Sequence, residues 1–215
     1  AVAMESEKPD VVLVLGDLTN LADKVGYDSF YSILFKPTRG AISLPVYGNH
    51  EGKDTANWRK RVAFPRFYVK RLDKLVAFYC LDATQPHGVG SVQYDSLVAW
   101  LERSKAQGVK AQIAAMHYPS DWATTGGGDA VIRTDLHPLF VRYGVKLVFT
   151  AHTHAYESFT MDSVNYIMDG RGGESSADST KFNPRQEWTR WREVSYGYTV
   201  VEIAGDTLRT YGVRI

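Results

Sequence analysis

Short apolar runs that end abruptly in glycine or polar residues are the main pattern of this chain. Val11 to Leu15 form an unbroken apolar run that is closed by Gly16 and Asp17. Such a run predicts a central strand of a parallel sheet, buried on both faces. Asp17 would then lie at the carboxyl end of this strand, on the edge where ligands and catalytic groups collect in open α/β sheets.

Three further apolar runs end in the same way. They cover residues 44–47, 111–116 and 147–149, and the polar side chains that follow them are Asn49, His50, His117, His152 and His154. Four strand ends would thus deliver a carboxylate, an amide and several imidazoles to one edge. Oxygen and nitrogen ligands that come from distant parts of a chain and are held rigidly are typical of a metal site.

The spacing of apolar residues between these runs predicts helices over 21–35, 91–105 and 135–143, and a shorter one that Asp54 caps. We expect paired strands over 67–69 and 75–81, strands over 155–159 and 164–168, and a closing hairpin over 196–203 and 207–213. Residues 174–195 have no clean period and are interpreted as a long loop. Its Trp188 and Trp191 either anchor it to the core or face a partner.

No internal repeat, low-complexity tract or linker divides the chain, so we predict a single α/β domain over residues 1–215. Ala1 to Glu7 read as the last turns of a helix. A chain that opens midway through a crossover helix is expected to have lost the strand in front of it, and no signal peptide can be read here.

Composition narrows the class of protein. Hydrophobic residues make up 44% and charged residues 23% of the chain, as in a soluble globular domain, and no apolar run approaches the ~18 residues of a membrane span. The formal charge of +1 gives no net attraction to nucleic acid or to an anionic membrane. The one cysteine, Cys80, lies in an apolar run and is expected to be a small buried hydrophobe.

The candidate ligands favour particular metals. A carboxylate, an amide oxygen and imidazoles suit Fe, Zn or Mn, and too few hard oxygens are present for Ca or Mg. Two such divalent or trivalent metals, held about 3.5 to 4 Å apart, lower the pKa of a bridging water and clamp the oxygens of a phosphoryl group. Ester hydrolysis at phosphorus is therefore the natural reaction.

Four motifs in order also resemble a known family. GDLTN at 16–20, GNHE at 48–51, MHYP at 116–119 and AHTHAYE at 151–157 are similar to those of the calcineurin-like metallophosphoesterases, most of all the purple acid phosphatase branch. The resemblance implies a two-sheet αββα sandwich. It also implies hydrolysis of small phosphoric monoesters by a metal-bridging hydroxide, and it slightly favours a secreted or extracytoplasmic location.

The resemblance also implies roles for single residues. Asp17 would bridge two metals. Asn49, His117 and His152 would complete one site, and His154 would serve the other. His50 would act as a general acid or as a donor that stabilises the transition state, and Glu51 would orient an imidazole.

Departures from the family pattern limit this expectation. The Asp motif of the family's first strand is absent, so the chain is expected to hold one metal well and a second one weakly. Asn20 replaces the iron-binding tyrosine of purple acid phosphatases, which favours a non-purple relative. Two alternatives stay open: a phosphodiesterase of the same fold, and a non-catalytic scaffold that binds a protein partner through residues 174–195.

The remaining polar candidates have simpler interpretations. His87 and His137 have no companion ligands and are expected to be exposed or to cap a helix. Arg171 and Arg185 are expected on a solvated face. The glycines at 126–128 lack the lysine and the strand-to-helix position of a phosphate-binding loop, so a flexible loop is favoured.

Overall fold

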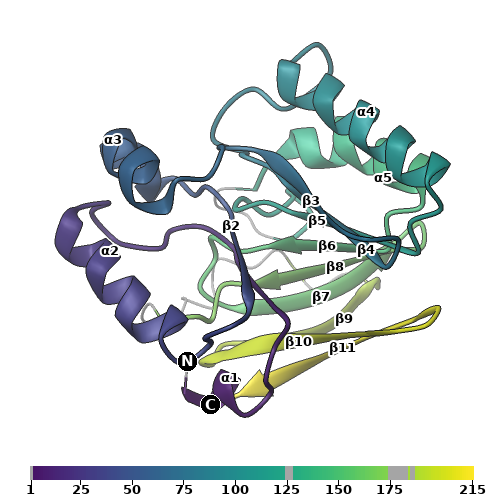
Figure 1. Cartoon of the computed structure of the whole chain (residues 1–215). Helices are drawn as coiled ribbons and strands as arrows, with labels where there is room; N and C mark the ends of the chain where they lie inside the picture. The colour runs from purple at the N-terminus through teal and green to yellow at the C-terminus, as the bar shows by residue number, and fades with distance from the viewer. Residues whose placement is uncertain (1, 124–127, 174–183, 185–186) are drawn as a thin grey trace.

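The computed structural model describes residues 2–123, 128–173, 184 and 187–215. A seven-stranded mixed sheet of order β3-β4-β5-β6-β8-β7-β9 forms its centre (Figure 1). These strands are β3 Tyr68–Leu72, β4 Val76–Cys80, β5 Ala111–Ala115, β6 Leu147–Thr150, β7 Tyr156–Met161, β8 Val164–Asp169 and β9 Thr189–Glu193. The ladders β4·β5, β5·β6 and β6·β8 are parallel, so their carboxyl ends share one edge.

Two smaller sheets pack on one face of this large sheet. The first pairs β1 Val11–Val14 with β2 Ile42–Pro45 in parallel, and the second is the hairpin of β10 Gly197–Ala204 and β11 Thr207–Arg214. Side chains from both small sheets join one buried cluster with Phe78, Ile113 and Leu147 of the large sheet. The expected α/β fold with two packed sheet layers is confirmed.

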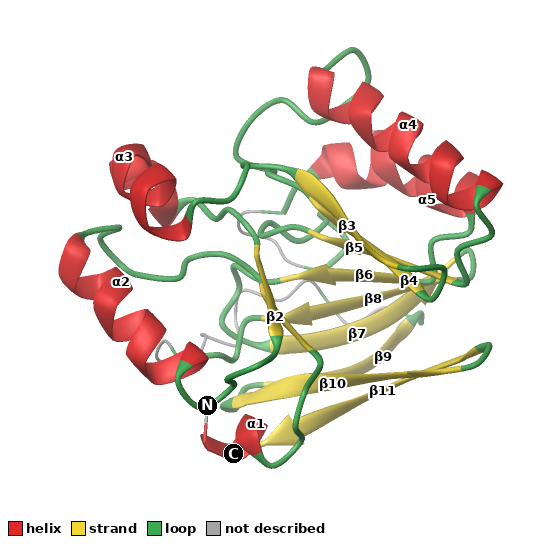
Figure 2. Cartoon of the chain, viewed as in Figure 1, coloured by secondary structure: helices red, strands yellow, loops and turns green. Residues whose placement is uncertain are grey.

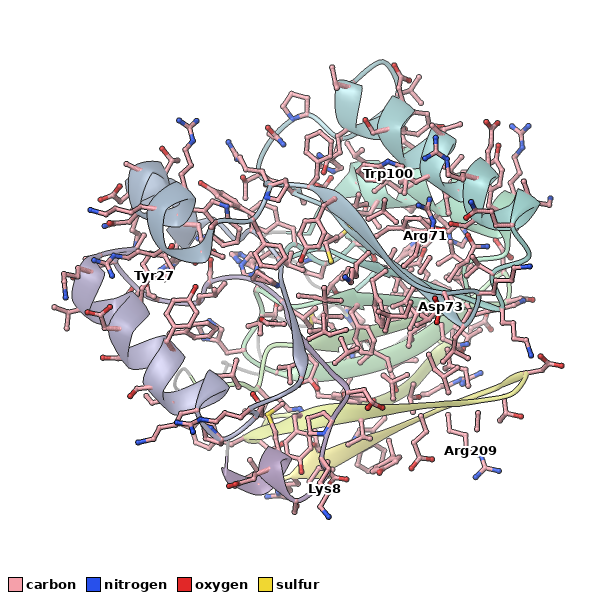
Figure 3. All side chains as sticks on the ribbon, viewed as in Figure 1. Lys8, Tyr27, Arg71, Asp73, Trp100 and Arg209 are labelled. Carbon is pink, nitrogen blue, oxygen red and sulfur yellow. The ribbon has the colours of Figure 1, made fainter. Side chains whose placement is uncertain are left out.

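The opposite face of the large sheet is covered by α4 Val92–Ala106 and α5 His137–Tyr143 (Figure 2). Strand β4 shows the alternation that makes this possible. Phe78 faces the small sheets, whereas Ala77 and Tyr79 belong to the cluster under the helices. Figure 3 shows Arg71 of β3 reaching toward Trp100 of α4, whose backbone carbonyl accepts a hydrogen bond of 3.3 Å from Nη2 of Arg71.

A third layer of short helices covers the ends of β1 and β2. Its buried residues include Tyr27 and Trp58, which pack with Tyr47 just after β2. The helix expected over 21–35 begins later, because the Asp23 carboxylate caps it by accepting from the backbone N–H of Gly26. The remaining helical segments are α1 Val2–Glu5, α2 Lys24–Phe30, η1 Tyr31–Phe35, η2 His50–Asp54, α3 Thr55–Asn57, η3 Trp58–Val62 and η4 Ile132–Leu136.

The strand predicted after residue 10 is present as β1. The expectation that it is central and buried on both faces is wrong for the described chain. Its ladder partner among the described strands is β2 alone. A strand with one neighbour keeps one edge uncovered. Val12 is buried, whereas Val11, Leu13 and Val14 stay partly exposed.

The expectation of a loop over residues 174–195 is wrong for the last part of this range. Thr189–Glu193 form strand β9, which pairs antiparallel with β7. Trp188 packs against the core beneath the helices, and Trp191 is 57% exposed. Residues 174–183 and 185–186, including Arg185, lie outside the described residues, as do 126 and 127 of the glycine run.

Two polar residues are buried although His137 was expected to be exposed or to cap a helix and Arg171 was expected on a solvated face. His137 lies between the Tyr166 hydroxyl, 2.8 Å from Nδ1, and the Asp162 carboxylate, 3.1 Å from Nε2. Arg171 pairs with Asp169 and Glu193 and lies over the Tyr156 ring. Both expectations were wrong, because partners on β8, on β9 and in the turn between β7 and β8 satisfy these buried groups.

Two expectations from composition can be compared with the structure. Cys80 is buried, as expected. In the described part of the chain, no helix has the length and apolar character needed to cross a membrane.

Candidate metal centre

Four predicted ligands meet where two sheet layers come together. Asp17 and Asn49 follow β1 and β2 of a small sheet, whereas His117 and His152 follow β5 and β6 of the large sheet. In Figure 2 the arrowheads of β6 and β8 point toward the side where α2 and α3 lie. The strand-end pattern in the sequence thus predicted a real convergence of side chains.

The donor atoms surround Nε2 of His117. Asn49 Oδ1 lies 3.0 Å from it, Asp17 Oδ2 3.1 Å and His152 Nδ1 3.2 Å. His117 is only 2% exposed. Its Nδ1–H donates to the Leu15 carbonyl at 2.7 Å, and this bond leaves Nε2 free to offer a lone pair to the cluster.

Unusual backbone geometry allows this close approach. Gly16 has φ +89° and Asp17 has φ +51°, so the chain turns back at the end of β1, and His152 has φ +64°. A Cβ at Gly16 would come 2.7 Å from His117 Nδ1, and a Cβ at Gly48 would collide with the Asp17 backbone and carboxylate. Both glycines are therefore required by space, and Gly16 is also required by its conformation.

Glu51 supports the turns, and among the described residues its carboxylate accepts from backbone N–H groups and from no imidazole, which corrects the expectation from the family. Its Oε2 accepts hydrogen bonds from the backbone N–H of Asp17 and Gly48, and its Oε1 accepts from Leu18. The side chain is fully buried, and burial together with the Asp17 charge raises its pKa. One carboxyl group thus ties the β1 turn to the β2 turn.

His50 lies beside the ligand cluster. Its backbone N–H donates to Asp17 Oδ1 at 2.8 Å, and its Nε2 lies 3.8 Å from Asp17 Oδ2. The Asn20 carbonyl accepts from His50 Nδ1 and from Lys53 Nζ, which fixes the orientation of the ring. Burial alone would raise the pKa of Asp17, but His117 and His50 lower it below the usual value, so the carboxylate is ionised.

The donor set fits one transition metal ion. Ligand atoms of Asp17, His117 and His152 all lie within 4.8 Å of one another, and the Asn49 amide oxygen completes a mixed O/N set. Such a set suits Fe, Zn or Mn. His154 does not belong to this group of described ligand atoms, so its role at a second metal stays a prediction.

Sequence reasoning missed the surroundings of two residues in the loops beyond β4 and β5. His87, expected to be exposed or to cap a helix, is buried, and its Nδ1 bonds the Gln85 carbonyl while its Nε2 lies 2.8 Å from Asp129 Oδ2. Tyr118 packs edge-on against His152, with 4.8 Å between ring centroids. The place of Tyr118 next to His117 in the MHYP motif was the sequence signal that could have predicted this contact. No sequence pattern predicts the contact of His87 with Asp129.

Comparisons with known proteins agree with this geometry. A family model described as calcineurin-like phosphoesterase matches residues 2–156. Purple acid phosphatase 18 of Arabidopsis thaliana is 30% identical over 131 residues, which cover 54% of this chain and 29% of that protein. Purple acid phosphatase 1 of Ipomoea batatas is 25% identical over 252 aligned residues, which cover 94% of this chain and 52% of that protein.

A solved structure has the same fold. The purple acid phosphatase PPD1 from seeds of yellow lupin (Lupinus luteus) superposes with a TM-score of 0.86 at 17% identity. The match covers 99% of this chain and 45% of the lupin chain. This chain therefore spans about half or less of the length of these three purple acid phosphatases.

Proposed function

Because the chain belongs to the calcineurin-like phosphoesterase family, we propose that it hydrolyses phosphoric monoesters with the help of bound transition metal. Members of this family are metal-dependent phosphoric ester hydrolases. The preference for monoesters is the finer part of the proposal, and the names of the purple acid phosphatase relatives support it. The observation that carries the proposal is the cluster of three donor atoms within 3.2 Å of His117 Nε2, with His50 beside it.

In this proposal each residue has a defined task. Asp17, Asn49, His117 and His152 hold the metal, and His154 adds a ligand for a second ion. Bound transition metal supplies a water of lowered pKa and polarises the phosphoryl oxygens. The Leu15 carbonyl keeps the His117 ring in the tautomer that can bind metal.

His50 would handle the proton of the leaving group. Its Nδ1 is occupied by the Asn20 carbonyl, so Nε2 is the nitrogen that faces the cluster, and the side chain is 30% exposed and open to a substrate. Because Nδ1–H donates to the Asn20 carbonyl, the doubly protonated ring carries its second proton at Nε2, and this proton can pass to the leaving alkoxide as the ester bond breaks, which leaves a neutral imidazole. General acid catalysis of this kind contributes about 10²- to 10⁴-fold to a rate.

The test compares a monoester with a diester. Protein isolated from its source is assayed with p-nitrophenyl phosphate and bis(p-nitrophenyl) phosphate, and the metal content is measured on the same sample. We expect faster turnover of the monoester, and a loss of about 100-fold in kcat for His50→Ala with unchanged metal content. Faster turnover of the diester would identify a phosphodiesterase. Metal-loaded protein with no turnover of either ester would favour the scaffold.

The proposal includes three further expectations from the sequence. They are the extracytoplasmic location, the identity of the metals as Fe, Zn or Mn, and a protein partner for residues 174–195. Elemental analysis of the isolated protein decides the second of these directly.

A further inference from the structure

Tyr118 is held against two metal ligands by ring contacts. Its ring meets His152 at an interplanar angle of 86° and a centroid distance of 4.8 Å, and it lies 5.6 Å from the His117 ring. The rest of the side chain packs against the core beneath α4 and α5. The position of the ring is therefore fixed by packing, independently of its hydroxyl group.

The Tyr118 hydroxyl has no protein partner within the described residues. Four other tyrosines, at 31, 68, 79 and 143, donate hydrogen bonds of 3.0 Å or less to protein acceptors. Tyr118 forms none with the described residues, and its side chain is only partly buried. A phenol that is oriented by its ring and left without an acceptor can donate to a bound molecule.

A phenol titrates near pH 10, so Tyr118 presents a neutral O–H donor at neutral pH. Two carboxylates of the neighbouring loops, Asp82 and Asp129, are engaged with other groups. Asp82 is paired with Arg66 at 2.5 Å. Asp129 faces His87 at 2.8 Å, so both outer carboxylates already have a cationic or titratable partner.

We propose that Tyr118 is a substrate-binding residue whose hydroxyl donates a hydrogen bond to a non-bridging oxygen of the phosphoryl group. This inference rests on the proposed function. His50 comes from the turn after β2, and its Nε2 lies beside Asp17. Tyr118 comes from the turn after β5, and its ring lies against His117 and His152, so the two side chains border the ligand cluster from different elements. His50 serves the leaving oxygen, and Tyr118 serves an oxygen that stays on phosphorus and is still present in the product, inorganic phosphate.

The test removes the hydroxyl and keeps the ring. Tyr118→Phe retains the contact with His152, and Tyr143→Phe is the matched control, because Tyr143 donates to Glu102 on α4. We measure kcat/KM for p-nitrophenyl phosphate, the metal content, and the binding of inorganic phosphate by calorimetry. Loss of one hydrogen bond to a charged oxygen should weaken phosphate binding and lower kcat/KM by about 10- to 100-fold. The control should match the wild type.

The two readouts separate this inference from the proposed function. If the wild type hydrolyses the monoester but Tyr118→Phe keeps full kcat/KM and full phosphate affinity at equal metal content, the role of Tyr118 is refuted and the proposed function stands. If the metal-loaded wild type hydrolyses nothing, the proposed function fails, and phosphate binding alone decides the role of Tyr118. A variant with reduced metal content would assign Tyr118 to supporting His152 instead, which also overturns the inference.

Discussion

At Gly48, the absence of a side chain lets the turns after β1 and β2 touch. The backbone there has no unusual φ, so alanine would fit the conformation but not the space. An added Cβ would collide with the backbone nitrogen and carboxylate of Asp17 and would lie 2.9 Å from Glu51 Oε2. The neighbours are backbone and a buried carboxyl group, which cannot move aside cheaply.

We therefore expect Gly48→Ala to lower the free energy of unfolding by about 1 to 3 kcal/mol. The displaced Asp17 should also weaken metal binding by about 10- to 100-fold, as for other changes to the support of a ligand. Gly52→Ala is the matched control, because its Cβ would meet nothing within 4 Å. Urea unfolding and metal titration give the two values, and equal behaviour of the two variants would contradict the role assigned to Gly48.

Single residues also differ in whether their positions could be predicted from the sequence. Asp17, Asn49, His117 and His152 could be predicted because each follows an apolar run, and the position of a strand end is a local property of the chain. The burial of His87, His137 and Arg171 could not, because each is satisfied by residues that only the fold brings near. A buried polar group shows in a sequence only through such partners.

At the scale of elements, the His87–Asp129 pair links two loops. His87 lies in the loop after β4, and Asp129 lies in the segment between β5 and η4. Burial alone would lower the pKa of His87. The contact with Asp129, the bond to the Gln85 carbonyl and the nearby Asp82 outweigh burial and raise it. The carboxylate of Asp135 also interacts with this ring.

This link should depend on pH. The folded-state pKa of His87 lies above its unfolded value, so its stabilisation is fully present below about pH 6.5 and is lost as the pH rises through the folded pKa. We expect His87→Gln to cost about 1 kcal/mol more at pH 5 than at pH 9. Urea unfolding at both values measures this. The pH-dependent part should disappear in an Asp129→Asn background, and a cost independent of pH would exclude the pair as its source.

The helices and strands differ in how clearly the sequence pattern predicts them. Continuous apolar runs predicted β1, β2, β5 and β6, because burial leaves no room for polar residues. Strand β9, with the sequence TRWRE, was not predicted, because it lies at the sheet edge and only Thr189 of its residues is buried. The start of α2 was placed too early, because Leu21 continued the apolar spacing although Asp23 provides the cap.

On the scale of the whole molecule, the candidate metal centre joins two sheets. Asp17 and Asn49 belong to the ends of the β1·β2 sheet, and His117 and His152 to the ends of the seven-stranded sheet. Strand periodicity predicts each sheet separately, and the family resemblance predicted their packing. A ligand that binds the folded chain and not the unfolded chain stabilises the folded state by mass action. A metal at this place would therefore hold the two layers together.

Removal of metal should consequently lower the stability of the whole fold, and not only the activity. At a free metal concentration of 100 Kd the stabilisation is about 2.7 kcal/mol, which corresponds to about 5 to 10 °C in Tm for a chain of this size. We expect EDTA to lower the Tm of the isolated protein by this amount, and metal to restore it. His117→Ala should have a low Tm that neither EDTA nor metal changes. His50→Ala, which leaves the donor set intact, should respond as the wild type does. If EDTA removes the metal from the wild type and the Tm does not move, the metal does not join the two sheets.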